Sequence, residues 1–195
     1  MSNIEQNGRS PELMSAGDTA LVVIDVQEKL MPAINDVERV ERSIRDLLDA
    51  ASLLGVRVVA TEQYPQGLGP TVTPVYERLG DVEPAEKKSF SCAACGELFE
   101  GLIQSGISKL LLCGVEAHVC VQQTALDLMG TGWKIFIAAD AVGSRRPFDR
   151  EIALRRLADS GATITTTESA IFEWCGGADH PQFKAVSSLV RQRPL

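Results

Sequence analysis

Two stretches of this sequence place a reactive side chain shortly after a buried apolar run. Asp25 directly follows the run ALVVI at residues 20–24, and Cys120 follows the run KLLLC at residues 109–113. The stretch KLLLCGVEAHVCVQQTALDLMG is typical of a strand, a tight turn at Gly114 and a helix, so Cys120 falls in the first turn of that helix. Amides at a helix N-terminus favour a thiolate, can lower its pKa and can bind an oxyanion. A carboxylate base and a thiol nucleophile would together support acyl transfer.

Each of these two residues also has a purely structural interpretation. Asp25 could cap the segment that follows it, and a buried Cys often packs as a small hydrophobe. In an open α/β sheet, however, the carboxyl ends of the strands line the ligand crevice. If the strands that precede Asp25 and Cys120 are neighbours in such a sheet, the two side chains face one crevice.

Two adjacent lysines, Lys87 and Lys88, precede the segment SFSCAACGELF. An ammonium group near the carboxylate and the thiol would stabilise a thiolate and a developing oxyanion. Adjacent lysines are more often simply solvated. The residue pattern by itself does not choose between Lys87 and Lys88.

The remaining cysteines carry weaker chemical signals. Cys92 and Cys95 have the spacing of a redox dithiol or of half a zinc site. A zinc site needs two more soft ligands, and the sequence contains no second pair of this kind. Cys113 and Cys175 are interpreted as packing residues.

Five arginines fall between residues 145 and 156. We interpret them as the solvated or subunit-facing side of a helix. Arg145 and Arg146 could also bind a carboxylate, because a guanidinium group matches its geometry.

Alternating strands and helices must position these side chains. Aliphatic runs typical of buried parallel strands occur at 20–24, 56–60, 109–113 and 134–139, with a weaker run at 162–166 and a short edge strand near 84–88. Helical spacing of apolar residues predicts helices at 37–54, 96–105, 118–130, 149–159 and 182–192. The alternation predicts an α/β fold, a three-layer α/β/α sandwich around a mostly parallel, doubly wound sheet.

Composition limits the classes of protein that this chain can belong to. With 195 residues, 45% of them hydrophobic and 23% charged, we expect one globular domain at 18–195 after a mobile tail at 1–17. The net charge of −7 argues against a nucleic-acid partner. The first residues are polar and the apolar runs are short, so we expect neither a signal peptide nor a membrane-spanning segment, and the five cysteines then predict reduced thiols and a cytoplasmic location.

Several segments together resemble the isochorismatase-like cysteine hydrolases, the superfamily that includes nicotinamidases and N-carbamoylsarcosine amidohydrolase. The chain is most similar to the isochorismatase-domain-containing branch. The resemblance covers nearly everything after residue 18 and rests on ALVVIDVQEKL, TEQYPQGLGPT, KKSFS, LLCGVEAHVCVQQTALDL, AADAVGSR, DREIALRRL and HPQFKAVSSLV.

The resemblance implies a catalytic triad of Asp25, Lys87 and Cys120. The family spacing Lys-x-x-aromatic-Ser selects Lys87, three residues before Phe90, over Lys88. The resemblance further implies a cis peptide between Val115 and Glu116, with the backbone amides of Glu116 and Cys120 as the oxyanion hole. The expected substrate contacts are Gln63, Phe90, Ala117 and His118. His118 also has a structural interpretation, as a solvent-facing or hydrogen-bonded side chain.

Departures from relatives narrow the expected function. Nicotinamidases hold a metal with an Asp and several His after the second strand, where this chain reads EQYPQGLGP and has no His. We therefore expect neither a metal nor another cofactor. Enzymes that act on isochorismate itself lack the nucleophilic Cys, so Cys120 favours the hydrolysis of a small amide or related acyl compound through a thioester. The alternatives are hydrolysis of a vinyl ether and a non-catalytic scaffold or redox-responsive protein.

The resemblance also implies a homo-oligomer, because pockets in the family are completed across subunits. A small molecule is the other expected partner, and a membrane is not expected. Large aromatic residues at the ends of predicted elements give weak support for a subunit interface, namely Trp133, Phe148, Phe172 and Trp174.

Overall fold

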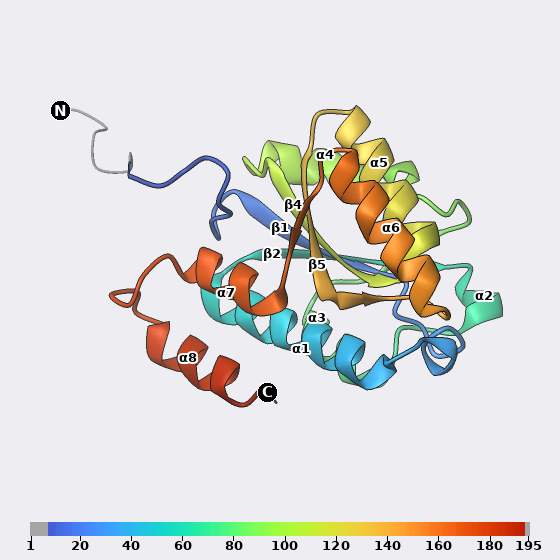
Figure 1. The fold of residues 1–195 in the computed structure, drawn as a ribbon, viewed down its shortest axis with the longest axis horizontal. Coiled ribbons are helices and arrows are strands. Elements are labelled where there is room, and N and C mark those ends of the chain that lie inside the picture. Colours follow the sequence, from blue (N-terminus) through green and yellow to red (C-terminus); the bar gives the residue numbers. More distant parts are fainter. Residues whose placement is uncertain (1–7, 194–195) are drawn as a thin grey trace.

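A single parallel sheet of six strands organises the chain (Figure 1). The computed structural model describes residues 8–193. The strands lie in the order β3-β2-β1-β4-β5-β6, and every neighbouring pair is parallel. Their bounds are β1 (Thr19–Ile24), β2 (Arg57–Gln63), β3 (Ala85–Lys87), β4 (Lys109–Val115), β5 (Lys134–Gly143) and β6 (Thr163–Thr165). The chain winds outward from β1 to one edge, returns to β4 and winds to the other edge, which confirms the predicted doubly wound sheet.

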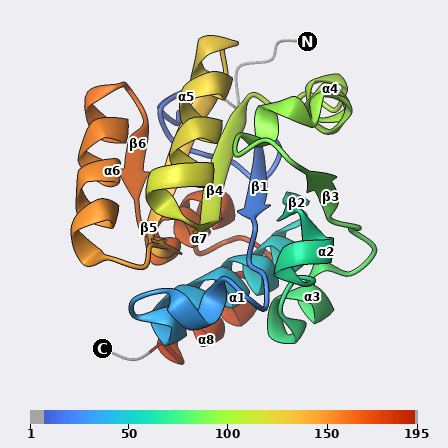
Figure 2. The ribbon, with the colours of Figure 1, turned by 90° about the vertical axis from the view of Figure 1, so that its right-hand side faces the viewer.

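Helices cover both faces of the sheet, as Figure 2 shows. On one face lie α1 (Val37–Leu54), α3 (Thr73–Leu79), α7 (Thr167–Cys175) and α8 (Phe183–Arg191). On the other lie α4 (Gly96–Gln104), α5 (Gln122–Gly130) and α6 (Pro147–Asp159). Successive side chains of β1 point to opposite faces, so Leu21 packs into the first core and Val22 into the second. The three-layer α/β/α sandwich is confirmed.

Three short α-helices were not predicted. They are α2 (Pro65–Leu68), α3 and α7. The first two lie in the segment rich in Pro and Gly at 62–95, and each has a proline in its first turn. The segment TESAIFEWC of α7 lacks a long helical period, but the Thr166 side chain accepts a hydrogen bond from the Ser169 amide and begins the helix.

Residues near the amino end of the described chain pack against the protein. Met14 is fully buried, and its amide donates to Glu173 Oε2 at 2.8 Å. The Lys109 ammonium donates to the carbonyl of Leu13 at 2.6 Å. The tail expected at 1–17 therefore does not extend over residues 13–17, while residues 1–7 lie outside the described part of the chain. Burial of the Met14 side chain accounts for the difference.

The four aromatic residues offered as interface candidates divide into two groups. Trp133 and Trp174 are buried, and Trp133 packs edge-to-face on Phe99 with ring centroids 6.2 Å apart. The prediction that they reach the surface was wrong, because each fills the core between a helix and the sheet. Phe148 and Phe172 are exposed, at 69% and 39%. No helix of the described chain is long and apolar enough to cross a membrane.

Candidate active site

The carboxyl ends of β1 and β4 form the point at which the sheet reverses its winding direction. Ile24 of β1 pairs with Gly114 of β4 on one side and with Thr61 of β2 on the other. A Cβ on Gly114 would lie 2.0 Å from the carbonyl oxygen of Ile24, so only glycine allows this approach. The two strands that precede Asp25 and Cys120 are therefore neighbours, as the sequence analysis required.

Asp25 turns inward at the end of β1. Its backbone has a φ of 54°, a left-handed conformation that aspartate tolerates better than most residues. Its amide donates to the carbonyl of Thr61 at 3.1 Å, and Thr61 Oγ1 donates to Asp25 Oδ1 at 2.8 Å. The Asp25 side chain is 0% exposed. Its carboxylate is therefore held by β2 and shielded from solvent.

Lys87 meets this carboxylate from β3. Its Nζ donates to Asp25 Oδ2 at 2.6 Å, to Gln63 Oε1 at 2.8 Å and to the carbonyl of Phe90 at 3.1 Å. Burial alone would lower the pKa of Lys87, but the Asp25 carboxylate, together with the Cys92 and Cys120 thiols, more than offsets burial, and the pKa lies above its ordinary value of 10.5. Asp25 and Lys87 thus form a charged pair closed off from water.

The geometry distinguishes the two adjacent lysines. Lys87 ends β3 and is buried, whereas Lys88 is exposed. Successive side chains of an extended segment point to opposite sides, so only one of the two can enter the crevice. The spacing to Phe90 selected the lysine that lies inside.

Cys120 lies in a π-helical turn between β4 and α5. This turn, η3 (Ala117–Val121), begins directly after Glu116 and runs into α5, so the predicted helix at 118–130 starts as a wider turn. The Cys120 residue is 6% exposed. Burial, followed by the Asp25 carboxylate, raises the pKa of Cys120, and the Lys87 ammonium only partly opposes this. The expectation that the helix N-terminus lowers this pKa was wrong, because the thiol is buried beside a carboxylate.

Glu116 directly precedes η3 and is hydrogen-bonded to the segment that follows β5. The peptide bond between Val115 and Glu116 is cis, as the resemblance implied. The Glu116 carboxylate accepts hydrogen bonds from the Arg145 amide at 2.9 Å and from Arg145 Nε at 3.1 Å. Arg145 lies between β5 and α6, so its predicted place on a helix face was wrong, and Glu116 is a partner that the sequence did not indicate.

A second thiol, that of Cys92, lies next to Thr61, the residue that donates to the Asp25 carboxylate. Cys92 is 0% exposed, its Sγ lies 3.3 Å from Thr61 Oγ1, and its amide donates to Thr124 Oγ1 at 2.8 Å. Burial and the Asp25 carboxylate raise the pKa of Cys92 to about 11. All five cysteines are free thiols. Cys92 and Thr61 belong to the site although the sequence analysis assigned neither to it; the position of Thr61 at the carboxyl end of β2 was the available signal.

A buried glutamine organises the loop after β2. Gln27 Nε2 donates to the carbonyls of Gln63 and Gly69, at 3.0 and 2.6 Å, and Gln27 Oε1 accepts from the Gln63 amide at 2.8 Å. The Gln63 side chain in turn accepts from Lys87 and donates to the Lys88 carbonyl at 2.8 Å. Gln63, expected to touch substrate, is thus engaged in holding the lysine. Gln27 was missed in the sequence analysis because nothing in the local sequence indicates that this glutamine side chain is buried.

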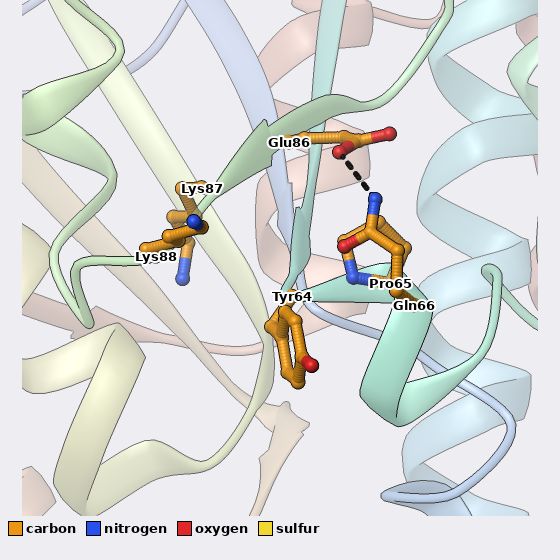
Figure 3. A pocket seen from close by; sticks show the side chains of 6 residues that line it. All are labelled: Tyr64, Pro65, Gln66, Glu86, Lys87 and Lys88. Carbon is orange, nitrogen blue, oxygen red and sulfur yellow. Dashed lines mark hydrogen bonds between the residues drawn. The ribbon is translucent and has the colours of Figure 1, made fainter.

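Residues around the lysine form an opening at the edge of the sheet. A cavity of about 160 Å³ is lined by Tyr64, Pro65, Gln66, Glu86, Lys87 and Lys88 (Figure 3). The two lysines lie on one side of it and the hydrogen-bonded pair of Gln66 and Glu86 on the other. Phe90, an expected substrate contact, is 54% exposed.

The other two expected substrate contacts lie on η3. Ala117 is buried, and His118 is half-buried, with Nδ1 3.0 Å from Ser144 Oγ. The hydrogen bond to Ser144 favours the structural interpretation of His118.

The described residues offer no cluster of side chains that could hold a metal ion. Within residues 8–193, no group of three or more His, Cys, Asp or Glu side chains could bind a metal ion. His180 lies in the turn before α8, where its Nδ1 accepts from the Gln182 amide. The loop after β2 offers Glu62, but this carboxylate is occupied by the amide and hydroxyl of Thr71.

The fold and the site define a parallel α/β protein with a buried Asp-Lys pair beside a thiol. The Isochorismatase domain family matches residues 19–169. This chain therefore belongs to the isochorismatase family, and its fold is that of an isochorismatase-family hydrolase.

Similar proteins cover most of the chain. "Isochorismatase domain-containing protein 2" of Bos taurus is 42% identical over 90% of this chain and 84% of its own length. "Isochorismatase domain-containing protein 1" of Danio rerio is 39% identical over 91% of this chain. The match covers 62% of the length of that protein. The structure of the MAR1 ribonuclease from Caenorhabditis elegans superimposes with a TM-score of 0.87 at 36% identity, covering 94% of this chain and 98% of that chain.

Two more distant structures share the fold. The nicotinamidase PncA from Bacillus subtilis has a TM-score of 0.67 at 24% identity and covers 76% of this chain and 99% of its own. The YcaC gene product of Escherichia coli, described as an octameric hydrolase of unknown specificity, has a TM-score of 0.85 at 20% identity and covers 93% and 91%.

Proposed function

We propose that this protein is a metal-independent cysteine hydrolase that acts on a small amide or related acyl compound. The observation that carries the proposal is the Asp25 to Lys87 ion pair, buried beside the Cys120 thiol. An ion pair closed off from water contributes little to stability, whereas a base beside a nucleophile is what acyl transfer needs. The membership of the isochorismatase family agrees with a hydrolase.

In the first proposed step, Cys120 Sγ bonds to the carbonyl carbon while the thiol proton passes to the Asp25 carboxylate. The raised pKa of Cys120 means that the resting thiol is neutral, so a base must take its proton. The carbonyl oxygen gains the electron pair of the C=O bond. The backbone amides of Glu116 and Cys120 are proposed to stabilise that oxyanion, together with the charge of Lys87.

The second step breaks the bond between carbon and nitrogen. The leaving amine takes the proton from Asp25, and an acyl thioester remains on Cys120. Water then gives a proton to Asp25 and attacks the thioester, and the proton returns to the sulfur as the acid leaves. No metal or other cofactor takes part. Phe90, Ala117 and His118 are the proposed substrate contacts, with Gln63 acting through Lys87.

The matched test of this mechanism compares hydrolysis with alkylation in the Asp25→Asn variant. Iodoacetamide reacts with thiolate, and the Asp25 carboxylate raises the pKa of Cys120 while Lys87 lowers it. Removing the carboxylate should therefore speed labelling of Cys120, by about tenfold, while hydrolysis falls at least about a hundredfold through loss of the base. Asp127→Asn, an exposed change on α5, is the control and should alter neither rate.

The measurements are ammonia release from a panel of small primary amides and peptide mapping after alkylation. Accumulation of an acyl group on Cys120 in quenched reactions would complete the support. Labelling of Cys95 ahead of Cys120, with no ammonia released from any amide, would overturn the proposal and favour a non-catalytic role.

We also propose a homo-oligomer and no nucleic-acid substrate. The exposed Phe148 and Phe172 and the octameric hydrolase among the structural neighbours support the first, and the net charge of −7 supports the second. Sedimentation should give a mass at least twice the 21.0 kDa of one chain. A monomer at micromolar concentration would contradict this. The cytoplasmic location stays a prediction.

A further inference from the structure

A second cavity lies beside η3, and apart from His118 the residues that line it have no role in the proposed chemistry. It has a volume of about 240 Å³ and is lined by His118, Arg145, Arg146 and Asp149. His118 comes from η3, the turn that carries Cys120, and the other three residues come from the segment between β5 and the first turn of α6. One wall of the cavity is thus the nucleophile turn itself.

The charges around this cavity are unevenly matched. Arg145 Nε is bound by the Glu116 carboxylate at 3.1 Å, and the Asp149 carboxylate lies 3.9 Å from His118 Nε2. The Arg146 side chain has neither an ion-pair nor a hydrogen-bond partner among residues 8–193, and it lines the cavity. Arg145 Nε is engaged by Glu116, although the Arg145 side chain is 64% exposed. The unmatched charge of the cavity is therefore positive and belongs to Arg146.

The size of the cavity limits what it can hold. Sites for drug-sized ligands measure about 300–1,000 Å³, so 240 Å³ suits one small group rather than an extended ligand. A guanidinium group binds a carboxylate through two parallel hydrogen bonds, and charge-assisted bonds of this kind are about twice as strong as neutral ones. A carboxylate matches both the charge and the volume.

We infer that this cavity is an anion subsite and that the substrate is a small amide carrying a carboxylate. This inference rests on the function proposed above. Arg146 binds the carboxylate, and Arg145 lines the same wall. Arg145 is held on Glu116, whose amide belongs to the proposed oxyanion hole. The reacting carbonyl and the anionic end of the same molecule are then both bound next to η3, which carries Cys120 and His118.

Binding can be tested without turnover by NMR, because the chain has two histidines and only one of them, His118, lines the cavity. Titration with succinate should shift the imidazole NMR signals of His118 saturably and leave those of His180 unchanged, and neutral succinamide should shift neither. Arg146→Gln should weaken succinate binding at least about tenfold, the loss expected for a charge-assisted pair. Arg156→Gln, an exposed arginine in the last turn of the same helix, is the matched control and should bind as the wild type.

Turnover then separates this inference from the function on which it rests. The wild type should release ammonia from succinamate with a kcat/KM at least about tenfold above that for neutral butyramide, and Arg146→Gln should remove this preference while Arg156→Gln keeps it. Equal rates for the two amides, with no shift of His118 by succinate, would overturn the anion subsite alone. Failure to hydrolyse any amide, with succinate still bound at His118, would overturn the hydrolase and leave the subsite.

Discussion

Two aspartate-lysine pairs lie at opposite ends of β1. At the amino end, Asp18 Oδ2 accepts from Lys109 Nζ at 2.7 Å, and the aspartate side chain is 33% exposed. At the carboxyl end, Asp25 and Lys87 meet at 2.6 Å, with side chains 0% and 1% exposed. The bond lengths are nearly equal and both lysines are largely buried, but water reaches the Asp18 carboxylate and does not reach that of Asp25.

This difference separates a structural pair from a chemical one. Lys109 also donates to the carbonyl of Leu13, so the amino-end pair ties the first described residues to the sheet. The carboxyl-end pair loses its hydration, a cost that the attraction between the charges barely offsets. It is placed beside the Cys120 thiol, whose proton the proposed mechanism transfers to the Asp25 carboxylate. Burial, rather than the residue types, distinguishes the two roles.

The largest effect is expected when the Cys120 thiol is removed, because the Asp18–Lys109 pair has no thiol beside it. Cys120→Ala should lower ammonia release by at least about a thousandfold, because the covalent route is lost. Cys92→Ala, which removes the second thiol behind Thr61, should reduce the rate far less. Initial rates on the amide panel measure both. If Cys92→Ala were the more damaging variant, the nucleophile would be misassigned.

The next effect breaks the buried pair itself. Lys87→Ala should lower kcat at least about a hundredfold, the loss caused by removing one oxyanion stabiliser, while Lys88→Ala should leave the rate near that of the wild type. Unpairing buried Asp25 should also cost about 3–5 kcal/mol of stability. The double variant Asp25→Asn/Lys87→Met should regain stability but not activity.

Breaking the amino-end pair supplies the counterpart to that experiment. Lys109→Met should lower the unfolding temperature and leave kcat within a few-fold of the wild type. A hundredfold loss of kcat in Lys109→Met, or full activity in Lys87→Ala, would remove the distinction between the two ends of β1.

The two pairs should stabilise the fold in different pH ranges. Burial alone would raise the pKa of Asp18, but hydrogen bonds from Lys109, Ser15 and Thr19 lower it below its ordinary 3.8. Its contribution is therefore present above about pH 3.8 and is lost as the pH falls through the folded value. The pKa of Lys87 lies above 10.5, so its contribution is present below that value and is lost as the pH rises through the folded one.

Denaturant unfolding across pH measures both contributions. Asp18→Asn should flatten the acid side of the stability curve by about 1 kcal/mol, the scale of a partly exposed pair. Asp25→Asn/Lys87→Met should flatten the alkaline side instead. The opposite assignment of the two sides would show that the pKa directions are wrong.

The smallest expected effect is that of chelation. Because Glu62 is occupied by Thr71 and the loop after β2 has no His, prolonged EDTA treatment should leave both activity and stability unchanged. Loss of turnover that zinc or iron restores would show a metal site that the side chains do not reveal.

Local sequence patterns were sufficient to predict the layers of this protein. Aliphatic runs specify buried parallel strands, and glycines such as Gly55 end the helices between them, because each rule acts over a few residues. The same local reasoning placed Asp25 and Cys120 at strand ends, but it left Lys87 and Lys88 open, and only the spacing implied by the family resemblance selected Lys87. Helix α7 was missed because nine residues carry too short a period to distinguish a helix from a loop.

Burial and pairing were decided only by the tertiary structure. The sequence alone determined which side chains could do chemistry. The assembled fold determined that Cys120 has a raised pKa, that Gln63 holds Lys87, and that Cys92 lies behind the ion pair. It also left the Arg146 side chain, which lines a cavity, without a hydrogen-bond or ion-pair partner among residues 8–193. A pKa or a hydrogen bond depends on groups brought together from distant segments and on the water they exclude, and neither quantity is a property of the neighbouring residues along the chain.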